Sequence, residues 1–246
     1  MLPHLKEEAR VLVSQSVHVM FVAIPAVVGT EAAGATCAAI ATFASQPGTS
    51  AQTLVAASYY GVLARFCFMN TQGFIAMCQR LGDHALHVLM ESMLASMDQA
   101  PPSIACLMLA ASLQVLVVLA AAGTPPPRLH AIADGAFNAG VNASSIFASQ
   151  RPAANHLYAL QDNLLKQTGL YVSEEESEPD TYVLPDSRRK QALASSDPIA
   201  SVTPKAVLAK AFQSLQAGLS QDVVQGVMAG VDADILKQAL AIAQQP

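Results

Sequence analysis

The chain has 246 residues, and 52% of them are hydrophobic, which is enough for one or two compact domains or a short solenoid and excludes a disordered chain. Tryptophan is absent, aromatic residues make up only 5%, and helix formers such as Ala and Leu dominate, so the composition favours an all-α fold. The net charge is −5, and no cluster of Lys and Arg extends beyond Arg188-Arg189-Lys190, which argues against nucleic-acid binding.

Two helices are predicted at the start of the chain. Apolar residues recur at helical spacing over 5–24 and over 30–44. Pro25 and Gly29 separate the two segments, because proline and glycine interrupt helices. We therefore expect the two helices to form an antiparallel pair.

The next predicted helices have clear start and stop signals. One covers 54–69, and Asn70 is expected to cap another over 71–81, which Gly82 ends. Asp83 is the expected N-cap of the helix that follows. The apolar residues of that helix keep the spacing of one amphipathic face; they are Leu86, Leu89, Met90, Met93, Leu94 and Met97.

The segment 104–122 is apolar over 19 residues, which is long enough to cross a membrane. With the similar stretch 11–28 it defines the alternative interpretation, a multi-pass integral membrane protein with two spans. Prolines flank 104–122 on both sides, and no aromatic belt accompanies it, so we favour a buried helix without membrane contact. A weaker helix is predicted over 128–147.

Helices of this length, separated by short breaks, indicate a HEAT-like array of helical hairpins over 1–172. In such an array, one helix of each hairpin is covered on both faces, and it is therefore apolar almost all round. The segment 104–122 fits that position. The predicted fold is an all-α HEAT-repeat superhelix.

A charged segment over 173–202 is expected to be a flexible linker, acidic first and basic afterwards. It accounts for part of an acidic excess, since 10 acidic and 6 basic residues follow Val172, against 8 and 7 before. The acids expected to contact a partner are Glu174, Glu175, Glu176 and Glu178.

Order is expected to resume at Thr203, followed by a proline, and a helical cap is predicted over 203–246. Its first helix has an apolar stripe made of Val207, Leu208, Ala211, Phe212 and Leu215. Ser220 and Asp232 are the expected caps of two further short helices.

No phosphate loop, nucleophile elbow or metalloprotease motif is present in the sequence, so we predict no enzyme and no cofactor. His84, His87 and Glu91 share one side of a helix, but we interpret them as a polar helix face and assign no metal. The cysteines are expected to be buried free thiols of a reducing compartment; they are Cys37, Cys67, Cys78 and Cys106.

Two segments resemble the importin-eleven type of nuclear transport receptor, within the importin-β superfamily. In the first, Tyr59, the pair Ala64-Arg65, Asn70 and Phe74 are similar to a Tyr, Ala-Arg, Asn-Thr and Phe pattern in the late HEAT repeats. The second runs from the acidic linker through Arg188, Arg189 and Lys190 to Asp197 and Pro198, and it is similar to the family's extreme C-terminus in order and spacing.

This resemblance implies a superhelix of HEAT hairpins that carries cargo into the nucleus and releases it when Ran-GTP binds. Receptors of this type import ubiquitin-conjugating enzymes and ribosomal proteins. Their Ran-binding region lies in N-terminal repeats that this sequence lacks, so we expect the chain to be a C-terminal fragment that contributes to cargo binding in the nucleus and cytoplasm. Arg65 is expected to hold a helix or loop inside the stack.

Overall fold

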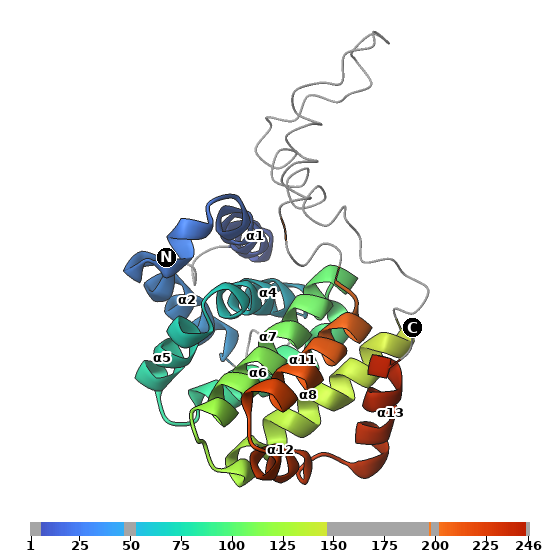
Figure 1. Ribbon diagram of the computed structural model, residues 1–246. Helices are drawn as coiled ribbons and strands as arrows, with labels where there is room; N and C mark the ends of the chain where they lie inside the picture. The colour runs from blue at the N-terminus through green and yellow to red at the C-terminus, as the bar shows by residue number, and fades with distance from the viewer. Residues whose placement is uncertain (1–5, 47–52, 147–196, 198–201, 245–246) are drawn as a thin grey trace, which may run out of the picture.

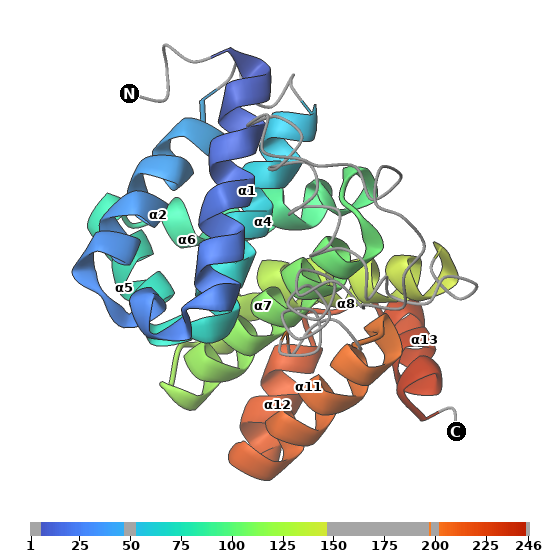
Figure 2. The same cartoon turned by 90° about the horizontal axis from the view of Figure 1, so that it is seen from above.

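The computed structural model describes residues 6–46, 53–146, 197 and 202–244. These residues form ten α-helices and two short 3-10 helices, and no strand occurs among them. The all-α prediction is therefore confirmed. The helices progress from α1 and α2 at one end of the molecule to α11, α12 and α13 at the other (Figures 1 and 2).

The first helices begin and end close to the predicted positions. Helix α1 (Glu7–Ala23) is followed by the 3-10 helix η2 (Pro25–Gly29) and by α2 (Glu31–Ala44). The hydroxyl of Thr30 accepts a hydrogen bond from the amide of Ala33 at 3.3 Å and so caps α2. The apolar stretch 11–28 is thus divided between two elements.

Helices α4 (Thr53–Met69) and α5 (Thr71–Leu81) are joined by Asn70, as predicted. The Asn70 side chain accepts a hydrogen bond from the amide of Gly73 at 3.0 Å, which satisfies one of the free donors at the start of α5. Gly82 ends α5 with a φ of 140°, a value that favours glycine because it has no Cβ.

Helix α6 (Ala85–Ala95) starts later than predicted, and the 3-10 helix η3 (Met97–Gln99) follows it. The expectation that Asp83 caps α6 is wrong. His84 occupies the N-cap position, and no side chain forms a cap hydrogen bond there. A turn over residues 83–84 therefore separates Asp83 from the first helical turn.

Helix α7 (Pro102–Ala121) lies at the centre of the molecule and contacts α4, α5, α6, α8 and α11. Helix α8 (Pro126–Ile146) follows after a break at Gly123, which has a φ of 76°. By length and composition, α7 alone among the described helices would suffice to cross a membrane, and 67% of its apolar window is buried inside the structure. Neighbouring helices therefore account for its apolar character on several sides.

The C-terminal helices are α11 (Pro204–Gly218), α12 (Gln221–Met228) and α13 (Ala233–Gln244). The whole predicted stripe of α11 is buried, from Val207 to Leu215. Thr203 and Asp232 accept amide hydrogen bonds as predicted caps. Ser220 occupies the N-cap position of α12 but forms no side-chain cap bond, so the expected cap is wrong in that respect.

The helices pack in two rows. In the first row, α1 contacts α4, α4 contacts α7, and α7 contacts α11. In the second row, α2 contacts α5, α5 contacts α6, α6 contacts α8, and α8 contacts α12 and α13. Contacts such as α2 with α4 and α7 with α8 join the rows, so each helix packs mainly against its immediate neighbours.

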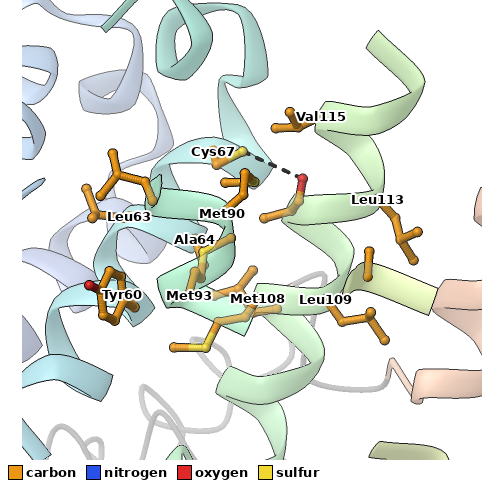
Figure 3. Close-up of a cluster of buried hydrophobic side chains, with 14 of the residues drawn as sticks. Tyr60, Leu63, Ala64, Cys67, Met90, Met93, Met108, Leu109, Leu113 and Val115 are labelled. Carbon is orange, nitrogen blue, oxygen red and sulfur yellow. Dashed lines mark hydrogen bonds between the residues drawn. The ribbon is translucent and has the colours of Figure 1, made fainter. Parts of the chain in front are cut away.

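The centre of the core lies where α4, α6 and α7 meet, shown in Figure 3. Leu63 of α4, Met90 of α6 and Met108 of α7 are each 1% exposed or less. The thiol of Cys67 donates a hydrogen bond to the carbonyl of Ala111 at 3.7 Å, which links α4 to α7 (Figure 3). Close packing of these long flexible side chains fills the space between three helices.

Candidate functional site

Arg65 forms an ion pair that no local pattern predicts. The guanidinium lies on α4 and is completely buried. Its Nη1 donates to Oδ1 of Asp197 at 2.6 Å, and its Nη2 donates to Oδ2 at 2.7 Å. This is the two-pronged geometry in which arginine binds carboxylates most strongly. That Arg65 holds a helix or loop inside a helical stack stays a prediction, and the structure shows its contact with Asp197.

His18 of α1 completes the buried cluster, and the sequence analysis did not single it out. Its Nε2 lies 3.4 Å from both Nε and Nη2 of Arg65. Because a guanidinium only donates hydrogen bonds, Arg65 is the donor in the bond to Nε2. Helices α1 and α4 and the residue Asp197 therefore meet at one point.

Of the remaining described positions of the family pattern, Tyr59, Ala64 and Phe74 lie in the core, and Asn70 is partly buried. Tyr59 and Phe74 are at most 1% exposed, and the Phe74 ring lies 6.5 Å from that of Phe66. Ala64 is fully buried. Besides capping α5, Asn70 donates from Nδ2 to the carbonyl of Val28 at 3.4 Å. These residues therefore hold helices together, and the three buried ones present no surface to a partner.

Several predicted positions fall outside the described residues. They are the four acids and the remaining positions of the second family segment: Glu174, Glu175, Glu176, Glu178, Arg188, Arg189, Lys190 and Pro198. The predicted linker 173–202 is described only at Asp197 and Val202. The partner-binding role of the acids stays a prediction.

The structure contains an open groove lined by residues of α6, η3 and α8, and we call it the α6/α8 groove. Its volume is about 410 Å³. Its carboxylates come from Glu91, Asp98 and Asp134, and among the described residues that line it there is no Lys or Arg. The apolar part of its lining includes Met90, Leu94, Met97, Ile132 and Ile146.

Of the three residues considered as a metal site, only two line this groove. His87 and Glu91 line it, whereas His84 does not. Within the described ranges no three His, Cys, Asp or Glu side chains are placed to hold a metal ion. Asp98 and Asp134 were not predicted, because they reach the groove from two elements far apart in the sequence.

A second groove lies between the first-row helices α4, α7 and α11, and we call it the α7/α11 groove. Its volume is about 490 Å³, and its apolar residues include Phe68, Leu113 and Val207. Lys210 is its cation, and the described lining contains no Asp or Glu. The two grooves therefore carry opposite charge.

All four cysteines are free and buried, as predicted. Burial raises the pKa of the thiols of Cys37 and Cys78 to about 12, and that of Cys106 to about 11. Burial, with a smaller effect of the neighbouring Cys78, raises the pKa of Cys67 well above its usual value. Reactive or metal-binding cysteines need a thiolate, so these are structural side chains.

We expect the folded protein to resist thiol reagents at pH 8 and to release four reactive thiols in guanidinium chloride. The unfolded thiols have a pKa of 9.0, below the folded values. Between pH 9 and about 12 the thiols ionise in the unfolded chain but not in the folded one, which favours unfolding. The free energy of unfolding should therefore be unaffected by these thiols below pH 9 and should fall as the pH rises from 9 towards 12. The absorbance of the chromophore that a thiol reagent releases measures thiol reactivity. Urea unfolding at increasing pH measures the change in stability. Rapid labelling of the native chain would contradict the prediction.

Comparison with known proteins adds no relative, because no family model, curated protein or solved structure matches the chain. The class that the fold defines is therefore an all-α protein of stacked helices.

Proposed function

We propose that this chain is a binding module without enzymatic activity, the C-terminal part of a nuclear transport receptor of the importin-eleven type. The ion pair between Arg65 and Asp197 is the observation that carries the proposal. The two segments that resemble the family were identified separately, and these two residues lie 132 positions apart. Their pairing in the core brings one residue of each segment into direct contact.

The arrangement of helices supports the HEAT-repeat part of the proposal. A HEAT array stacks helical hairpins so that each contacts its neighbours, with one helix of every hairpin in each row. The alternation of α1, α4, α7 and α11 in the first row with α2, α5, α8 and α12 in the second resembles that scheme, with α6 and α13 as additional second-row helices. The second row would then supply one continuous surface for cargo.

In this proposal the partners are cargo proteins, and Ran-GTP binds in repeats outside this chain. The module works in the nucleus and cytoplasm and needs no cofactor or membrane. Broad helix surfaces bind through many modest contacts, so we expect specificity to depend on several side chains together.

Direct binding tests the proposed function. The purified chain should bind at least one member of a panel of ubiquitin-conjugating enzymes and ribosomal proteins, measured by surface plasmon resonance at physiological salt. An equimolar unrelated acidic protein serves as a control for charge alone. Failure to bind any member of the panel, by a chain shown to be folded by circular dichroism, would overturn the proposal.

We expect the acids of the charged segment to add to cargo affinity without adding to stability. Replacing Glu174, Glu175 and Glu176 together with Ser should weaken a basic cargo several-fold, since charges at an interface rim mainly accelerate association. The thermal unfolding midpoint should not change. Asp222→Ser removes an exposed carboxylate from α12 and is the control. A large loss of thermal stability in the triple variant would contradict the expected role.

A further inference from the structure

We infer that the α6/α8 groove binds a basic amphipathic helix of a partner protein. This inference rests on the proposed function as a binding module and names the chemistry of the partner. The length of the groove, its apolar lining and the sign of its charge support it.

The length of the groove matches a short helix. On α8 its lining extends from Ala131 to Ile146. At a rise of 1.5 Å per residue this interval is about 22 Å long, which is the length of a helix of about 15 residues. The groove runs between two helices of the second row, so an incoming helix would pack on both.

The apolar lining of the groove is adaptable. Met90, Met97 and Ile132 belong to its lining and have exposed fractions of 1–4%. Ile146, which is 50% exposed, lies at one end of the lining. Methionine side chains adjust their shape to different apolar partners. An amphipathic helix can therefore place its apolar face here and leave its polar face towards the rim.

The charge of the groove selects a basic helix. Glu91 of α6, Asp98 of η3 and Asp134 of α8 contribute carboxylates from three separate elements. Oδ1 of Asp134 also accepts a hydrogen bond from the amide of Asp232 at 3.1 Å, and Asp232 lies outside the groove lining. The α7/α11 groove has a similar size but carries Lys210 and lacks a carboxylate in its described lining, so groove formation alone does not produce the acidic character.

A peptide experiment tests the inference on the full chain. The probe is a fluorescein-labelled synthetic helix of about 15 residues, with Leu on one face and Lys on the flanks, and its binding is measured by fluorescence anisotropy. The variant Asn138→Arg places a bulky cation inside the α6/α8 groove and should weaken binding by about tenfold or more. Ser214→Arg adds the same charge in the α7/α11 groove and should leave the affinity within about twofold.

A second peptide has Glu in place of every Lys and should not bind the unmodified chain. Equal affinity of the Lys peptide for the two arginine variants would overturn the inference, because binding would then reflect overall charge. Cargo binding separates the two proposals. If a cargo binds the chain and Asn138→Arg does not weaken it, the groove inference fails and the receptor function stands. If the peptide binds as expected and no cargo does, the receptor function fails.

Discussion

Replacing Asp197 with Ala should lower the free energy of unfolding by about 3–5 kcal/mol, because it leaves the buried Arg65 guanidinium without a carboxylate. Both side chains are at most 2% exposed, so solvent does not screen the remaining charge. Chemical denaturation followed by circular dichroism measures the loss. We expect the midpoint to fall while the helical signal of the native state remains.

A control variant distinguishes the effect of removing the whole ion pair from the effect of leaving one buried charge. Replacing both residues at once, Arg65→Met with Asp197→Leu, should recover most of the lost stability, since apolar side chains of similar volume often replace a buried ion pair without cost. A loss below about 1 kcal/mol for Asp197→Ala would show that the pair is solvated in solution, as exposed ion pairs are.

The change Phe66→Ala should cost about 3–5 kcal/mol, as is typical for removal of a buried aromatic side chain. The Phe66 ring is 2% exposed and lies 6.2 Å from the ring of Phe21 on α1 and 6.5 Å from that of Phe74 on α5. The substitution therefore leaves a cavity where three helices meet. The urea concentration at the unfolding midpoint measures the effect.

Two matched variants make this second prediction specific. Phe66→Leu keeps most of the apolar volume and should cost clearly less than Phe66→Ala. Val88→Ala removes a side chain that is 44% exposed on α6 and should change stability by no more than about 0.5 kcal/mol. Similar losses for Phe66→Ala and Val88→Ala would contradict the packing described here.

Local signals in the sequence were sufficient for most helix boundaries. Asn70 and Gly82 delimit α5 because a cap acceptor and a positive φ are properties of single residues and their neighbours. The buried stripe of α11 is also predictable, because apolar residues that recur at helical spacing form one face and that face packs against the core. The prediction that Asp83 caps α6 is wrong because it rests on residue type alone, whereas the turn at His84 decides where α6 begins.

The candidate sites depend on contacts between distant segments, which single-sequence patterns do not encode. Arg65 and Asp197 belong to the two segments that resemble the family, but nothing in their spacing predicts that they pair. His18 lies in an apolar helix, and its role emerges only beside Arg65. The acidic character of the α6/α8 groove arises because Glu91, Asp98 and Asp134 converge from elements that are separate in the chain.

The distance in sequence between Arg65 and Asp197 also sets a delay, during synthesis, before the ion pair can form. During synthesis at about 5–20 residues per second, roughly 7 to 26 s separate the two residues, so α4 leaves the ribosome long before its carboxylate partner exists. In that interval the first-row helices contain a guanidinium that cannot be buried at low cost. A product that ends before Asp197 therefore keeps this defect permanently and is a natural target for chaperones and proteases.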